Sequence, residues 1–159
     1  EISMDLPLDS EFIEHYINWA NNKNKLPDLI VQMRPTYPNR TLTHLNKMIH
    51  IMINNPEYTS LRTVVEMTKS PYKMYRNIDN VLVPLFEEVD GLKEPYNNCR
   101  QNLPDIYLHN GYIDIIRVSS YLKTKSITGD KIYPYIMNKD EVDDIDSIED
   151  WEKAEKKNI

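Results

Sequence analysis

The residues with the clearest chemical potential lie near the C-terminus, where Asp144 and Asp146 flank an isoleucine in the stretch VDDIDSIEDW. Side chains two positions apart on an extended segment point the same way, so the two carboxylates can share one ligand. Two hard carboxylate oxygens at a strand end suit Mg²⁺, with water and substrate phosphates completing its shell. A structural interpretation stands beside this one, because Asp146 or Ser147 can cap the following helix. Glu149 or Asp150 would then close a capping box.

A second polar group lies in the proline-stiffened loop RPTYPNR. It holds two guanidiniums and two hydroxyls, contributed by Arg34, Thr36, Tyr37 and Arg40. Arginine makes bidentate contacts to carboxylate and phosphate, so the loop suits an anionic ligand. The alternative is a rigid connection whose Arg40 only reaches solvent or a helix end.

The elements that must hold these loops follow from the hydrophobic periodicity. It predicts helices over residues 10–21 and 41–55, and strands over 27–33, 60–67 and 131–137. Asp9 or Ser10 is expected to cap the first helix. Ligands of α/β sheets bind beyond the carboxyl ends of the strands, which is where the loop 34–40 and the segment 142–146 are expected to lie.

Residues 71–104 have a different texture, rich in Tyr, Pro and Asn, and alternate like a hairpin that turns near 77–80. Strand character resumes over 105–118 on either side of an expected His109-Asn110-Gly111 turn. The fold class is therefore α/β: a mostly parallel sheet flanked by helices, with an inserted β-arm. Projecting arms often pack against a second subunit.

Composition excludes several classes of function. The chain has 159 residues, a net charge of −6 and no stripe of Lys or Arg, which argues against nucleic-acid binding. No apolar run approaches ~18 residues, so no membrane association is expected. The lone Cys99 fits a reducing, cytoplasmic environment. Only three glycines occur, all isolated, so a glycine-rich phosphate loop is absent. No Ser/His/Asp group or zinc-type His pair can be assembled.

Five motifs in order resemble the acylneuraminate cytidylyltransferase family, the CMP-sialic acid synthetases. They are QMRPTYPNR, SPYKMY, CRQNLPDIYLHNGYIDIIR, GDKIYPYIM and DDIDSIEDWEKAE, which together span nearly the whole chain. In that family a PTSPLR-like loop, a Pro-Tyr step, an RQ pair, an NG turn and a DID-type terminal motif follow in this order.

The resemblance implies a Rossmann-like, three-layer domain that dimerises through its arm. It also implies a reaction: cytidylyl passes from CTP to the anomeric hydroxyl of a nine-carbon α-keto acid sugar, pyrophosphate is released, and Mg²⁺ is the cofactor. By motif, Asp144 and Asp146 match the metal and base aspartates. The residues that match positions near the sugar are Thr36, Asn110 and the pair Arg100 and Gln101, and the resemblance implies that this pair reaches the sugar across a homodimer. Arg34 and Tyr37 depart from the Gln and Ser of many members, and this larger, more basic loop is expected to alter the sugar pocket.

A larger departure concerns the start of the chain. The family opens with a strand and a Gly/Lys/Arg-rich loop for the CTP phosphates, and Glu1 corresponds to a point about a third of the way into the fold. Residues 1–159 are therefore expected to form the C-terminal two-thirds of one cytidylyltransferase domain, without the first βα units and inactive alone. Two other interpretations stay open: an inactive dimerisation or binding module, and a glycosyltransferase that uses the Asp-Ile-Asp triplet.

Overall fold

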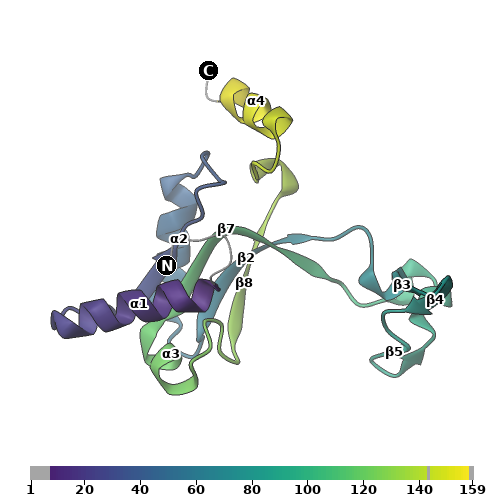
Figure 1. Ribbon diagram of the computed structural model, residues 1–159, viewed down its shortest axis with the longest axis horizontal. Coiled ribbons are helices and arrows are strands. Elements are labelled where there is room, and N and C mark those ends of the chain that lie inside the picture. The colour runs from purple at the N-terminus through teal and green to yellow at the C-terminus, as the bar shows by residue number, and fades with distance from the viewer. Residues whose placement is uncertain (1–7, 143, 158–159) are drawn as a thin grey trace. The chain divides into compact units, whose positions relative to one another are not determined.

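The computed structural model describes residues 8–142 and 144–157, so Glu1 lies outside the described ranges. The chain forms two compact units, which we call the sheet unit (up to residue 64, and from 109 onward) and the inserted unit (65–108). The helices and strands, labelled in Figure 1, are α1 (Asp9–Asn22), β1 (Leu29–Gln32), α2 (Leu42–Asn54), β2 (Ser60–Glu66), β3 (Tyr75–Ile78), β4 (Val81–Pro84), β5 (Glu88–Val89), β6 (Leu92–Lys93), β7 (Tyr107–Arg117), α3 (Val118–Thr124), β8 (Ile132–Met137) and α4 (Ile148–Lys157).

The main sheet has the strand order β1-β7-β2-β8. β1 and β7 are antiparallel, with Leu29 opposite Arg117. β2 also runs against β7, since the Arg117 amide donates to the Thr59 carbonyl and the Ile113 amide donates to the Thr63 hydroxyl. β1 and β2 are therefore parallel to each other with β7 between them. The sheet is mixed, and the expectation of a mostly parallel sheet was wrong because a central strand runs the opposite way.

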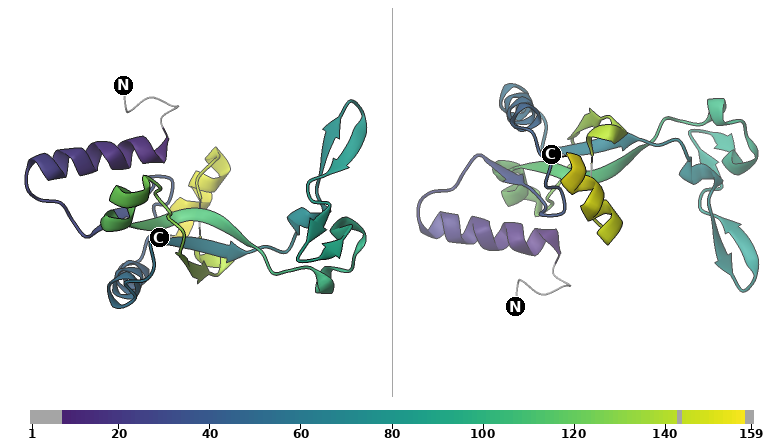
Figure 2. Two further views of the ribbon diagram at one scale, coloured as in Figure 1. Left: turned by 90° about the horizontal axis from the view of Figure 1, so that it is seen from below. Right: turned by 90° about the horizontal axis from the view of Figure 1, so that it is seen from above.

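Helices cover both faces of this sheet. Figure 2 shows α1 and α2 on opposite faces. On the α1 face, a buried cluster joins α1, β7 and α3 through Ile13, Ile17, Ile116, Val118 and Tyr121. α2 buries Met48 and Met52 completely. The 3.6-residue periodicity predicted α1 and α2 to within about one residue at each end, whereas the short helix α3 was not predicted.

β7 corrects a second expectation. The predicted His109-Asn110-Gly111 turn does not reverse the chain, because β7 continues unbroken from Tyr107 to Arg117. The Asn-Gly signal instead marks a local kink: Gly111 has φ +74°, and the Asn110 side chain accepts a 3.0 Å hydrogen bond from the Tyr112 amide. A left-handed glycine inside a strand is typical of a bulge.

β8 forms one edge of the sheet. It begins beside β2, where the Thr59 amide donates to the Lys131 carbonyl at 2.8 Å. Pro134 lies in the middle of this six-residue strand, and Ile132 and Ile136 are exposed. Proline is tolerated there because an edge strand has one side without ladder partners.

The inserted unit contains two small hairpins. β3 and β4 pair around Asp79 and Asn80, which both have positive φ (51° and 64°). Such a pair is typical of the tight two-residue turn of a hairpin, so the predicted hairpin near 77–80 is confirmed. Around this turn Ile78, Val81 and Leu82 are exposed.

Of the two predicted helix caps, the one at α1 is absent and the one at α4 is present. α1 begins after Leu8, which makes no side-chain cap, so the expectation that Asp9 or Ser10 caps this helix was wrong. At α4 the expected cap is confirmed. The Ser147 hydroxyl accepts from the Asp150 amide at 3.2 Å and donates to its carboxylate at 2.7 Å. This hydrogen bond lowers the pKa of Asp150.

Candidate functional site

Arg40 organises the loop that follows β1. Its guanidinium donates from Nη1 to the Tyr37 carbonyl (2.6 Å), from Nε to the Tyr112 carbonyl of β7 (3.1 Å), and from Nη2 to the Arg34 carbonyl. Burial lowers the pKa of Arg40. One side chain therefore closes the loop upon itself and attaches it to the sheet, so the expected anionic ligand would meet an arginine that is already engaged.

Tyr37 forms the buried floor of the site. Its side chain is only 2% exposed and meets the Tyr112 ring edge to face, 5.8 Å between centroids. The hydroxyl donates to the Asn110 carbonyl at the β7 kink. Burial, followed by a hydrogen bond to Asp144, raises the pKa of Tyr37 well above its ordinary value. The phenol therefore stays protonated at neutral pH and acts as a donor.

Hydrogen bonds hold the segment that carries Asp144 and Asp146 at two places, upstream of the pair and between its members. Upstream, a 3-10 turn (Lys139–Glu141) is closed by a capping box between Asn138 and Glu141. Glu141 also approaches His44 of α2, at 3.8 Å. Between the two aspartates, the Ile145 amide donates to the Thr36 carbonyl at 3.0 Å. The two loops predicted to lie at the strand ends therefore touch directly.

These contacts shape one pocket of about 330 Å³. Its lining residues are Asp9, Arg34, Pro35, Thr36, Tyr37, Asn110, Asp144 and Asp146. Six of the residues singled out from the sequence therefore meet in one place. Arg40 does not line this pocket but ties the adjoining loop together, and its role in ligand binding stays a prediction.

Arg100 and Gln101 belong to the inserted unit rather than to the unit that carries this pocket. They form a short exposed 3-10 turn (Arg100–Asn102). Their expected place near a sugar stays a prediction.

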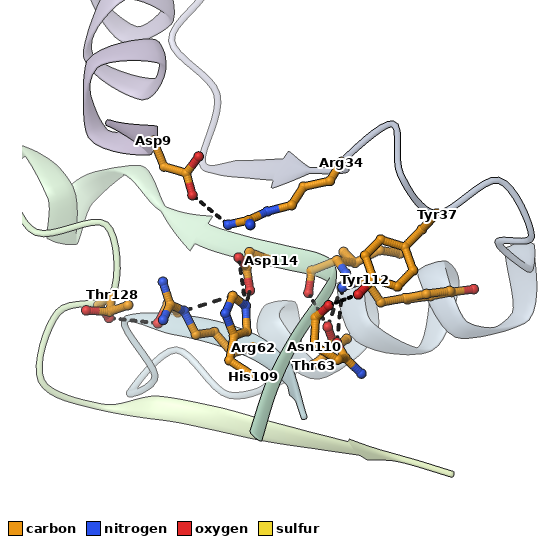
Figure 3. A network of polar contacts seen from close by, with 12 residues as sticks. Asp9, Arg34, Tyr37, Arg62, Thr63, His109, Asn110, Tyr112, Asp114 and Thr128 are labelled. Carbon is orange, nitrogen blue, oxygen red and sulfur yellow. Dashed lines mark hydrogen bonds and ion pairs between the residues drawn. The ribbon is translucent and has the colours of Figure 1, made fainter. Parts of the chain in front are cut away.

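Sequence reasoning missed Asp9 as a pocket residue. Its carboxylate forms a 2.7 Å ion pair with Arg34, and Figure 3 shows the two side chains reaching toward each other from α1 and from the loop after β1. The only sequence signal was an acid at a helix start, which indicated a cap. A contact across 25 positions leaves no trace in local periodicity.

A second cluster of polar side chains lies on neighbouring strands of the sheet, around Asp114 of β7. Asp114 is 6% exposed and receives His109 Nε2 at 2.9 and 3.1 Å, with Arg62 Nε 3.8 Å away. Its cross-strand partner is Gln32, whose Oε1 is buried and has no hydrogen-bond partner among the described residues. Arg62, His109 and Asp114 are labelled in Figure 3. His109 thus has a structural partner that the expected turn would not have provided.

The pocket fits a divalent cation only when a bound substrate supplies some of the metal ligands. No three His, Cys, Asp or Glu residues within 8–142 and 144–157 gather closely enough to hold a metal by themselves. Asp144 and Asp146 offer two hard oxygen ligands in a partly polar pocket. Mg²⁺ commonly binds through one or two carboxylates, with water and substrate phosphates filling its remaining positions. The residues present therefore fit Mg²⁺ that arrives with a phosphorylated substrate.

Fold and site together define an α/β protein with an acidic, arginine-containing pocket beyond the ends of its strands. No family model matches the chain. In sequence it is similar to an N-acylneuraminate cytidylyltransferase of Escherichia coli O18:K1:H7 (strain RS218 / NMEC), with 28% identity over 154 residues. That alignment covers 97% of this chain and 34% of the relative, so the chain spans about a third of the relative's length. None of the described helices has the length and apolar character needed to cross a bilayer.

Proposed function

We propose that this chain carries the sugar side and the metal carboxylates of a cytidylyltransferase. The reaction joins CMP from CTP to the anomeric hydroxyl of a nonulosonic acid and releases pyrophosphate. The observation that carries the proposal is the meeting of Arg34, Thr36, Asn110, Asp144 and Asp146 in one pocket. Similarity to the Escherichia coli enzyme over nearly the whole chain supports the same activity.

The roles follow from the chemistry of each group. Asp144 and Asp146 would hold Mg²⁺, which when bound supplies positive charge for the phosphate oxygens. A carboxylate oxygen of this pair that does not bind the metal is suited to accept the proton of the attacking anomeric hydroxyl. Arg34 is suited to the sugar carboxylate. Thr36 and Asn110 offer hydrogen bonds to its hydroxyls.

A homodimer belongs to the same proposal. The inserted unit exposes apolar side chains at its first hairpin, at Ile78, Val81 and Leu82. The same unit has an apolar pocket of about 570 Å³, lined in part by Met67 and Met74. Exposed apolar patches of this kind often mark protein–protein contacts. In a dimer, Arg100 and Gln101 of one subunit would contact the sugar bound to the other.

The test is turnover of CTP, dependent on the sugar acid, by the product of the gene that encodes this sequence. We expect CMP-sugar and pyrophosphate in equal amounts when N-acetylneuraminate and Mg²⁺ are present, and neither product when the sugar acid is left out. Asp144→Asn and Asp146→Asn should each lower the formation of both products by about 10³-fold. Asp130→Asn, an exposed carboxylate outside the pocket, is the matched control and should keep them. Turnover of a nucleotide sugar in place of CTP would contradict the proposal.

A further inference from the structure

The ion pair between Asp9 and Arg34 is a distinctive feature of the pocket. Arg34 is the one cation among the described lining residues, and it shares the pocket with three carboxylates, those of Asp9, Asp144 and Asp146. Its Nη2 contacts Asp9 Oδ2 at 2.7 Å. Asp9 comes from α1, whereas the aspartate pair lies between β8 and α4. A guanidinium among three carboxylates has alternative partners, and here it is bound to the one on α1.

The position of Arg34 is built by the backbone as well. A Cβ atom added at Gly111 would lie 3.4 Å from Arg34 Cδ and 3.5 Å from its Nε. The Arg34 side chain therefore lies directly against the kink of β7, at ordinary van der Waals distance from the position that a Cβ would take. Figure 3 shows it extending over this strand toward Asp9. The kink and Asp9 together set the direction in which the guanidinium points.

Neither helix capping nor stability accounts for Asp9. α1 has no side-chain cap, so Asp9 serves its own helix only through the small favourable effect of an acid in the first turn. The side chains of Arg34 and Asp9 are 40% and 36% exposed, and exposed ion pairs contribute little to stability. Arg34 nevertheless lines the same pocket as the aspartate pair.

We propose that Asp9 is a positioning residue that holds Arg34 away from Asp144 and Asp146 and so keeps this pair open for a divalent cation. This positioning role rests on the proposed function only in the premise that Asp144 and Asp146 bind a cation. Without Asp9, the nearest carboxylates left in the pocket for Arg34 are those of the pair itself. An arginine bound there would compete directly with the metal, because both need the same oxygens.

The test is binding of Mn²⁺ alone to the 159-residue chain, followed by electron paramagnetic resonance without CTP or sugar. Asp9→Asn should weaken Mn²⁺ binding about tenfold, an effect typical of a close charge pair. Arg34→Gln should tighten it, since the competing cation is gone. In the Arg34→Gln background, Asp9→Asn should change the affinity less than about twofold, because the residue that it positions is absent.

Glu14→Gln is the matched control. Glu14 lies on the same helix and forms a 2.9 Å ion pair with Lys125 outside the pocket. It should leave Mn²⁺ binding unchanged, and circular dichroism should confirm that every variant is folded. If Asp9→Asn lowers the Mn²⁺ affinity equally with and without Arg34, the proposal is overturned. It is also overturned if Asp9→Asn does not lower the Mn²⁺ affinity at all. Mn²⁺ binding that Asp144→Asn leaves unchanged would overturn it too.

The two proposals fail in different ways. Suppose that Mn²⁺ binds at the aspartate pair and that the effect of Asp9→Asn depends on Arg34, but that the gene product turns over no CTP. This result would refute the cytidylyltransferase and retain the positioning role. Turnover with no such dependence would do the reverse.

Discussion

The sheet unit and the inserted unit differ in how much of their apolar surface they bury. The sheet unit has helices on both faces and fully buried side chains at Met48, Met52 and Ile113. In the inserted unit, the hairpin residues Val81 and Leu82 are 61% and 66% exposed. The pocket lies wholly in the sheet unit, so the chemistry rests on the part that has its own core. The exposed hairpin of the inserted unit presents apolar surface of the kind that a contact with another molecule needs.

The largest expected effect is on turnover, and it tests which of the two units carries the catalytic residues. Asp144→Asn should lower turnover of the full-length protein by about 10³-fold, because carboxylates that hold a catalytic metal stabilise several kcal/mol of developing charge. Arg100→Ala in the inserted unit should lower it only ~10-fold, mainly through KM. Steady-state kinetics at saturating Mg²⁺ compare the two. A greater loss from Arg100→Ala would place the essential chemistry in the inserted unit and break the comparison.

The next effect concerns the two cores. Met48→Ala should cost about 3 kcal/mol of unfolding free energy, since it leaves a cavity in a fully buried site. Leu82→Ala at the hairpin should cost less than about 0.5 kcal/mol in the monomer. Urea denaturation of both variants at a concentration that keeps the protein monomeric measures the difference. Similar losses would mean that the hairpin is packed within the monomer.

Arg40 tests the rigidity of the pocket loop. Arg40→Ala should cost about 2 kcal/mol, because carbonyls at Arg34, Tyr37 and Tyr112 lose their donor. Arg40→Lys should recover only part of this, since an ammonium does not reproduce the planar fork. Arg76→Ala in the exposed strand β3 is the control and should be within about 0.5 kcal/mol of wild type. Equal losses for Arg40 and Arg76 would contradict the anchoring role.

The hairpin tests association. Replacing Val81 and Leu82 by Ser should weaken a homodimer about tenfold, because exposed apolar side chains are lost from a contact surface. Sedimentation equilibrium of the full-length protein measures this, and replacing Leu42 by Ser, a residue of the sheet unit that is 74% exposed, supplies the comparison. A dimer weakened only by the Leu42 change would assign the contact to the sheet unit.

The smallest effect lies at the start of α4. The folded pKa of Asp150 is lowered by the Ser147 hydrogen bond, so its contribution to stability is present above the unfolded value near ~3.9 and is lost as pH falls through the folded value. Asp150→Asn should therefore change the melting temperature slightly near neutral pH and flatten its decline below about pH 4. Thermal melts between about pH 3 and 7 measure this. An unchanged acid slope would show that Asp150 plays no part in it.

Local patterns predicted what local interactions decide. The periodicity of α1 and α2, the Ser147 cap and the hairpin at Asp79 and Asn80 all depend on residues a few positions apart. The meeting of the two loops after β1 and β8 was also predicted, because the ends of parallel strands share an edge of a sheet.

Long-range contacts could not be predicted in the same way. Asn110 and Gly111 were expected to reverse the chain, but pairing of β7 with both β1 and β2 turned the same signal into a kink. Asp9 was expected to cap its helix, but Arg34 offers a charged partner that the sequence places 25 positions away. Arg40 was expected to bind a ligand or to reach solvent, and instead donates to three backbone carbonyls.

Pro134 has a consequence for handling and engineering the protein. A sheet edge with exposed isoleucines on either side of its midpoint is the kind of template on which further chains add as strands and aggregates grow. Proline removes one amide from that row, so an incoming strand cannot form a continuous ladder. We therefore expect Pro134 to limit the addition of further strands at this edge. A tag or second domain fused beyond this strand should leave Pro134 in place.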